Sequence, residues 1–315
     1  MLENKMHIRP EDMVHTMDDD KGNDRLYING VGVRRINEVS DYVVTKDSVT
    51  KYHEHDHGYE VFTVDRGSVE ATVCGKRCMM HQGDFLVVPP FTPHGFVYKE
   101  EGTIWRELFS EMDMHGYMMD YVSILNNCPE EKREEIRKEF NKANGQTGLP
   151  EPDALWVDPK EMPFLRPKGT YVKQFCYDGI VLNMLYGRWD HNGIKELWEY
   201  VLQKGARFEW HEFHPQWDLF IVKEGSVRVN VANHEPFVAH QRDIINIPPY
   251  NLHDITALED GAVLHDYNCR HYLFRLLQQI DVIRERRPHD LTWENIRPLM
   301  KTADCHLTGF GLTDV

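Results

Sequence analysis

Four residues in the first third of the chain have the types and spacing of a metal site. His53 and His55 are separated by one residue, Glu60 follows shortly after, and His94 comes after a Pro-Pro pair. Three imidazoles and one carboxylate suit a divalent transition metal, and such a set leaves coordination positions open. These residues therefore predict metal-dependent chemistry on a bound small molecule.

The elements that position these side chains are predicted to be strands. Side chains alternate between the two faces of a strand, so His53 and His55 share one face. Glu60 has the wrong parity for that face unless one extra residue bulges out, and Gly58 is the natural place for a bulge. We expect His94 to come from a later strand and to complete the set.

The same pattern occurs twice along the chain. Residues 60–73 (EVFTVDRGSVEATV) and 218–231 (DLFIVKEGSVRVNV) both alternate apolar and polar residues, as half-buried strands do. Residues 83–96 (GDFLVVPPFTPHGF) match residues 242–255 (RDIINIPPYNLHDI) in the same way. The chain therefore contains a duplicated β-domain of roughly 90 residues.

The second copy predicts a weaker metal set, which consists of His211, His214, Asp218 and His253. It is less regular because an aspartate replaces the glutamate and a phenylalanine stands where the second histidine is expected. One bulge near Glu212 or Phe213 brings the four side chains together. If Glu212 rather than His211 faces inward, the site holds two histidines and two carboxylates, or it is vacant.

Composition and charge exclude two classes of partner. The 315 residues carry 36 Lys and Arg against 51 Asp and Glu, a formal net charge of −15. This balance argues against nucleic-acid binding, which needs a basic patch, and against docking on an anionic membrane. No apolar run approaches the roughly 18 residues of a membrane helix, and the first residues lack the layout of a signal peptide. We therefore expect a cytoplasmic protein without nucleic-acid or membrane partners.

The two sets of motifs resemble those of the cupin superfamily. The first cupin motif, HxH(x)4E(x)6G, is matched by His53, His55, Glu60 and Gly67. The second motif is matched by Gly83, Pro89 and His94. It departs at the glycine of its PxG element, where Phe91 stands, and at its closing asparagine. The resemblance implies that the first barrel binds its metal through His53, His55, Glu60 and His94.

The resemblance also implies an all-β dominated fold of two jelly-roll-like cupin β-barrels with a helical linker and C-terminal helices. The expected divisions are an N-terminal arm at 1–24, a first barrel at 25–112, a helical linker at 113–168, a second barrel at 169–269, and C-terminal helices with a tail at 270–315. Apolar residues at helical spacing support the linker helices and the C-terminal helices.

The cupin fold hosts many reactions, so the resemblance does not select one. Our leading expectation is an enzyme, a non-haem dioxygenase acting on a small chelating phenolic or carboxylated substrate, with iron as the favoured metal and Mn, Zn or Ni as alternatives. A redox-neutral isomerase, lyase or decarboxylase, and a non-catalytic small-molecule sensor, are the other hypotheses. Glu60 as a base and His57 as a proton shuttle are the predicted catalytic residues. Substrate-binding residues are unknown, and a homodimer is compatible with the resemblance.

Overall fold

Two compact units make up the chain. The computed structural model describes residues 5–18, 21–28, 38–110, 114–177, 179–187, 189, 196–209, 217–269, 273–303 and 309–310. The first unit comprises Met13–Thr170, and the second joins the segment ending at Asp12 to the residues from Tyr171 onward. Strands predominate over helices in the described ranges, which confirms the all-β dominated fold. No described helix is long and apolar enough to cross a membrane.

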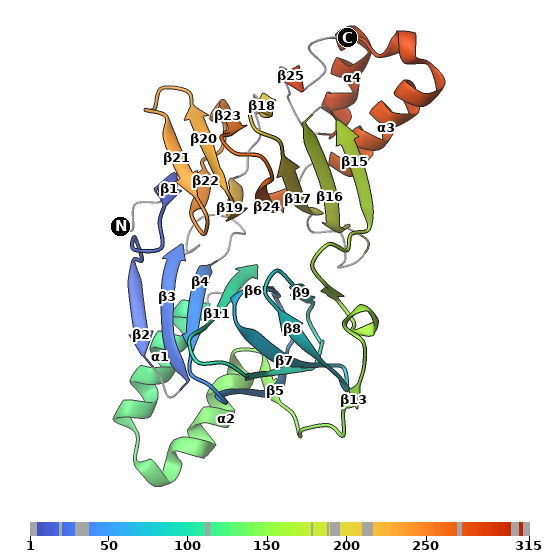
Figure 1. Cartoon of the computed structure of the whole chain (residues 1–315). Coiled ribbons are helices and arrows are strands. Elements are labelled where there is room, and N and C mark those ends of the chain that lie inside the picture. The colour runs from blue at the N-terminus through green and yellow to red at the C-terminus, as the bar shows by residue number, and fades with distance from the viewer. Residues whose placement is uncertain are drawn as a thin grey trace. The chain divides into compact units, whose positions relative to one another are not determined.

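The first unit contains two facing sheets, which we call the first barrel (Figure 1). Its larger sheet has the order β14(Leu165–Arg166), β9(Phe85–Val88), β6(Tyr59–Arg66), β11(Thr103–Ser110), β4(Val39–Val44), β3(Gly22–Ile28), β2(His15–Asp18). The other sheet has the order β12(Gln146–Gly148), β5(Val49–His55), β10(His94–Tyr98), β7(Ser68–Val73), β8(Lys76–His81), β13(Leu155–Trp156). Buried side chains from both sheets, including Phe62, Phe96 and Trp105, form one apolar core.

The second unit repeats this plan, and we call its two sheets the second barrel. One sheet has the order β1(His7–Ile8), β22(Ile244–Ile247), β19(Asp218–Glu224), β24(Ala262–Cys269), β17(Glu196–Leu202), β16(Ile180–Tyr186), β15(Lys173–Tyr177). The other has the order β21(Phe237–His240), β20(Ser226–Val231), β23(His253–Ala257), β18(Arg207–Glu209), β25(Gly309–Phe310). The duplicated β-domain predicted from the repeat is therefore present, as the two jelly-roll-like barrels that the resemblance implies.

The repeated Gly-Ser-Val sequence has the same structural role in both barrels. Gly67 and Gly225 join consecutive strands with φ angles of 84° and 72°, a region that favours glycine. The serine hydroxyl that follows donates to a carboxylate in each case, from Ser68 to Glu100 and from Ser226 to Glu259. The motif therefore fixes the register of the strands, which in turn places the residues before it.

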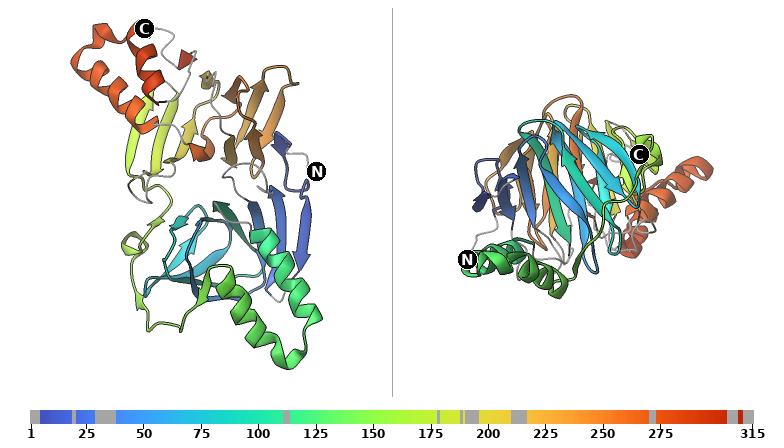
Figure 2. Two further views of the ribbon diagram at one scale, coloured as in Figure 1. Left: turned by 180° about the vertical axis from the view of Figure 1, so that it is seen from behind. Right: turned by 90° about the horizontal axis from the view of Figure 1, so that it is seen from below.

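Helices pack outside the sheets in each unit. The linker forms α1(Met114–Asn127), a short 3-10 turn at Glu130–Lys132 and α2(Arg133–Ala143), in agreement with the two helices expected there. The C-terminal helices are α3(Leu273–Arg286) and α4(Trp293–Ala303), which lie side by side in both views of Figure 2. Buried leucines and isoleucines of α3 extend the apolar core of the second barrel. Two further 3-10 turns span Pro159–Glu161 and Pro288–Asp290.

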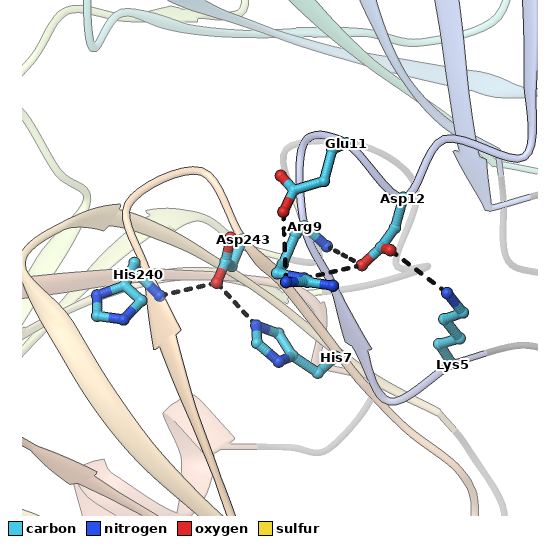
Figure 3. Close-up of polar contacts among 7 residues, drawn as sticks. All are labelled: Lys5, His7, Arg9, Glu11, Asp12, His240 and Asp243. Atoms are coloured by element: carbon cyan, nitrogen blue, oxygen red, sulfur yellow. Dashed lines mark hydrogen bonds and ion pairs between the residues drawn. The ribbon is translucent and has the colours of Figure 1, made fainter.

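The N-terminal segment adds an edge strand to the second barrel. We expected one arm at 1–24, but β1 pairs with β22, whereas β2 and β3 extend a sheet of the first barrel. The His7 side chain contacts the Asp243 carboxylate, with 2.7 Å between Nε2 and Oδ2, and the same oxygen accepts the His240 amide (Figure 3). Arg9 donates to Asp12 within the segment. Side-chain contacts thus attach this strand to the edge.

The linker adds an edge strand to the first barrel at the corresponding place. There β14 pairs with β9, the counterpart of β22. Asp84 accepts the His81 amide at 2.8 Å and the Lys168 amide at 2.9 Å. The expected helical linker therefore also supplies strands, since β12 and β13 extend the other sheet of the same barrel.

Candidate metal centre

The sharp turn after β5 carries the chain from one sheet of the first barrel to the other. His53 and His55 lie on β5, and Glu60 lies on β6 in the opposite sheet. Gly58, with a φ of 76°, lies in this turn. Our expectation of a bulge within one strand was wrong, because the parity rule applies only to a continuous strand and the turn resets it. Residues close in sequence consequently meet across the barrel interior.

The structure brings the four predicted ligands of the first barrel together. The ligand atoms of His53, His55, Glu60 and His94 all lie within 4.8 Å of one another, and all four residues are buried. The Nε2 atoms of His53 and His55 are 3.0 Å apart. Glu60 lies between two imidazoles, with Oε1 at 3.1 Å from His55 Nε2 and Oε2 at 2.9 Å from His94 Nε2.

Backbone carbonyls orient two of these imidazoles. His53 Nδ1 lies 2.7 Å from the Lys51 carbonyl oxygen, and His94 Nδ1 lies 2.8 Å from the Thr92 carbonyl oxygen. A carbonyl only accepts, so Nδ1 carries the proton in both rings. Each Nε2 therefore presents its lone pair to the centre, as metal-binding histidines do.

Two polar atoms of the cluster have no hydrogen-bond partner among the described residues. Glu60 Oε2 and His94 Nε2 are buried and make no aligned hydrogen bond to any described residue. Such atoms are costly to leave without a partner. A cation bound between them would satisfy both, so this donor set fits a divalent metal.

The electrostatics of the cluster also suit a cation. Burial, with His94 beside it, lowers the pKa of His53 to about 3, so this imidazole is neutral at neutral pH. Burial alone would raise the pKa of Glu60, but His55 and His94 hold it well below its usual range. The carboxylate is therefore ionised. A neutral imidazole and an ionised carboxylate are the protonation states that bind metals.

Comparison with known proteins agrees with this geometry. The family model described as "Cupin domain" matches residues 42–104 and 198–265, one segment in each barrel. Each of the two barrels therefore contains a cupin domain. No curated protein sequence matches it.

Solved structures of other two-barrel cupins resemble this one. Oxalate decarboxylase of Lactobacillus farciminis, in complex with formate, has a TM-score of 0.57 at 13% identity, over 93% of this chain and 95% of that chain. Oxalate decarboxylase of Bacillus subtilis at pH 4.6 has a TM-score of 0.53 at 15% identity, over 92% and 84%. Pumpkin seed globulin has a TM-score of 0.53 at 11% identity, over 81% and 84%. At these identities the likeness shows the fold.

Aromatic side chains line the barrel interior next to the cluster of this cupin. Phe96 lies 5.6 Å from the His94 ring and Phe62 lies 6.4 Å from it, measured between ring centres. Trp105 stacks on Phe62 at 4.9 Å. This apolar wall limits the access of water to the cluster from that side.

The second cupin barrel holds a related pair of side chains. His253 Nδ1 lies 3.0 Å from the Asn251 carbonyl oxygen, so its Nε2 faces inward, 3.4 Å from Asp218 Oδ2. Both residues are buried. His211 and His214 lie outside the described residues, so the weaker metal set remains a prediction.

His57, the predicted proton shuttle, lies on the exposed turn between β5 and β6. Its ring Nδ1 hydrogen-bonds to the carboxylate of Asp56, which is also exposed. The structure does not bring His57 into the buried cluster, and its catalytic role remains a prediction.

Sequence analysis missed Glu107, an acidic residue on the interior face of β11. Its neighbours on that face are Trp105 and Phe109, both buried. Two signals could have identified it. The alternation in TIWRELFS places Glu107 on the same face as Trp105, and the second copy has an acid, Asp266, at the corresponding position.

Proposed function

We propose that this cupin is a metal-dependent enzyme whose first barrel binds a divalent transition metal through His53, His55, Glu60 and His94 and acts on a small chelating carboxylate. The observation that carries the proposal is the buried cluster, in which Glu60 and His94 converge without satisfying each other. A bound metal would hold and polarise an oxygen of the substrate.

The residues of the chain perform three tasks in this proposal. The carbonyls of Lys51 and Thr92 fix two imidazoles through Nδ1. Glu60 supplies the negative charge that offsets the cation. The wall of Phe62 and Phe96 excludes water and strengthens electrostatic interactions inside the barrel.

For the reaction we favour redox-neutral chemistry, a lyase or decarboxylase. The support is that two of the similar structures are named as oxalate decarboxylases and match along nearly the whole chain. The dioxygenase expected from the sequence is the second candidate, because the aromatic rings beside His94 offer a surface for a phenolic substrate. The two candidate reactions predict different metals. Iron is expected for the dioxygenase and not for the lyase or decarboxylase.

Elemental analysis and an oxygen-controlled assay test the proposal. Protein purified without a metal-affinity tag should contain about one equivalent of divalent metal or more. Turnover of small carboxylates should release carbon dioxide equally well with and without oxygen. Oxygen consumption matched to turnover would instead establish the dioxygenase. Ligand binding without turnover, unaffected by a chelator, would contradict both enzyme hypotheses and favour a sensor.

The remaining expectations concern partners and location. A small-molecule substrate without nucleic-acid or membrane partners, a cytoplasmic location and a homodimer are all consistent with the acidic composition and the fold. Light scattering of the purified chain would show whether it forms the homodimer.

A further inference from the structure

Glu107 faces the same interior as the metal cluster. On β11, Trp105 belongs to the apolar core, whereas Arg106 contacts Asp41 on the opposite face, so the alternation turns Glu107 inward. Glu107 pairs with Phe62 on β6, and Phe109 pairs with Glu60. Glu107 and the ligand Glu60 are therefore diagonal neighbours across two strands, a relation that separates side chains by about 7 Å.

The surroundings of Glu107 favour its neutral form. Burial is the largest cause that raises the pKa of Glu107 well above its usual range, and the negative charges of Asp24 and Glu60 add to it. Lys21 and the Trp105 indole act in the opposite direction without reversing the shift. Glu38 lies just before β4, two residues from Ser40, and so faces the same side as Ser40. Glu38 is also buried and is another acid on this side. A neutral carboxyl has a hydroxyl hydrogen to donate.

A second donor lies on the same face. The Trp105 indole nitrogen is buried beside the Glu107 carboxyl, and it makes no well-aligned hydrogen bond to that carboxyl or to any other described residue. A buried N–H without a partner is costly, and a ligand that supplies an acceptor would remove this cost. The hydroxyl-bearing Ser40 pairs with Glu107 on the neighbouring strand β4. Polar hydrogens therefore gather at one place beside an otherwise apolar wall.

We propose that Glu107 and Trp105 form a hydrogen-bonding subsite in the first barrel, which binds a second oxygen group of a small carboxylate whose first carboxylate reaches the metal cluster. This proposal rests on the proposed function and narrows its substrate class to dicarboxylates and their relatives with a distal carbonyl. Glu107 is the group that contacts this oxygen of the ligand. The Trp105 indole N–H, on the same face of β11, helps to position that oxygen.

The second barrel shows what the same position does in a structural role. Asp266, the counterpart of Glu107, is 5% exposed and accepts a hydrogen bond of 3.1 Å from the Tyr200 hydroxyl. Glu107 retains more accessible surface than Asp266 does. The Asp266 carboxylate is already bonded by a tyrosine hydroxyl, whereas Glu107 is less enclosed and has only the Trp105 indole beside it. This contrast supports a binding role in the first barrel only.

Calorimetric titration of the metal-loaded full chain tests the subsite. The probes are dicarboxylates from oxalate to glutarate, each paired with the monocarboxylate of the same length. We expect at least one dicarboxylate to bind about tenfold tighter than its partner, as one added hydrogen bond to a charged oxygen allows. Glu107→Ala should abolish this preference, and Glu107→Gln should keep part of it because the amide still donates. The matched control Asp266→Asn should keep it fully.

The pH dependence gives a further readout. The wild-type preference should be present below the raised pKa of Glu107 and should fall as pH rises through it, because the carboxylate no longer donates. Glu107→Gln should show no such fall. Trp105→Phe, which keeps the stacked ring, should reduce the preference by about fivefold.

Metal content separates failure of the subsite from failure of the proposed function. A Glu107→Ala protein that retains its metal and an unchanged dicarboxylate preference overturns the subsite while leaving the metal centre intact. Wild-type protein that binds no metal overturns the proposed function and the subsite together. Equal affinity of the wild type for both members of every probe pair also overturns the subsite.

Discussion

Corresponding strands follow the same order in the first and second barrels, except that β13 has no counterpart among the described residues of the second, and corresponding positions can be compared directly. The Gly-Ser-Val turns, with their serine-to-glutamate hydrogen bonds, are present in both. In both, an aspartate just before the corresponding strand accepts the backbone amide of the histidine three residues earlier, Asp84 from His81 and Asp243 from His240. These contacts maintain the register of the strands. Because both barrels have them, both barrels have the same arrangement of strands around the interior.

Among the described residues, the interiors of the two barrels differ more than their frames. The first holds three imidazoles and Glu60 in one buried cluster. In the described part of the second, Asp218 and His253 form a pair at 3.4 Å. The inner faces are where ligand-type residues change, because a side chain there can be replaced without disturbing the ladder of backbone hydrogen bonds. A duplicated fold can therefore keep its architecture while the side chains inside each copy change.

Removing one histidine from each barrel gives the largest expected effect. His94→Ala should lower the metal content of the first barrel at least about tenfold, because ligand loss leaves Glu60 without a shared cation. His253→Ala is the matched change in the second barrel and should leave that metal in place. Elemental analysis of both variants makes the comparison. Equal loss in the two variants would show that the second barrel binds metal as well.

The sequence was sufficient for the cluster and insufficient for its neighbours. His53, His55, Glu60 and His94 were predicted because ligand type and repeat spacing are written in the sequence. The way in which Glu60 reaches the cluster was not predicted. The sequence of residues 56–58 does not distinguish a turn between two sheets from a bulge within one strand. The carbonyls of Lys51 and Thr92 orient the rings through backbone atoms, which any residue provides, so no sequence pattern could have identified them.

The faces of β11 and β24 opposite Glu107 and Asp266 carry different pairs of polar side chains at the same position. Arg106 Nε donates to Asp41 at 2.6 Å and lies 3.5 Å from Asp65, all fully or nearly fully buried. In the second barrel, His265 occupies the place of Arg106 and lies 3.1 Å from Glu199. Burial opposes the charge of Arg106, but Asp41 and Asp65 raise its pKa above the usual value, so it stays ionised.

Breaking these two pairs should destabilise the barrels unequally. Arg106→Met leaves buried carboxylates without a counter-charge and should cost about 3–5 kcal/mol in free energy of unfolding. His265→Ala should cost about 1–2 kcal/mol, the cost of a lost hydrogen bond to a more exposed carboxylate. Urea unfolding of both variants measures the difference. A cost for His265→Ala as large as that for Arg106→Met would show that the two pairs stabilise their barrels equally.

The edge strands are attached by different kinds of contact. In the second barrel the His7 ring binds Asp243 and stacks on Phe237 at 4.7 Å, whereas in the first barrel Asp84 accepts the backbone amide of Lys168. His7→Phe should keep the stacking and lose the hydrogen bond. The expected cost is about 1 kcal/mol, seen as roughly fivefold faster amide exchange in β1. Lys168→Ala is the control for the first barrel and should leave the exchange of β14 unchanged.

One backbone feature is shared by both barrels and departs from the cupin motif. Phe91 and Tyr250 stand at the turn before β10 and β23 with φ angles of 58° and 62°, and their residues are 68% and 59% exposed. A side chain in this left-handed region is strained, and these rings gain little from burial that would offset the strain.

Restoring glycine at either position should therefore stabilise its barrel. Phe91→Gly and Tyr250→Gly should each raise the free energy of unfolding by about 0.5–1 kcal/mol, the relief of strain less the entropy that glycine adds to the unfolded chain. Thermal unfolding of the two variants measures this smallest effect. A gain at Tyr250 with a loss at Phe91 would mean that the Phe91 ring makes stabilising contacts in the first barrel that its counterpart lacks. It would also extend the difference between the barrels from their interiors to the turn that leads into His94.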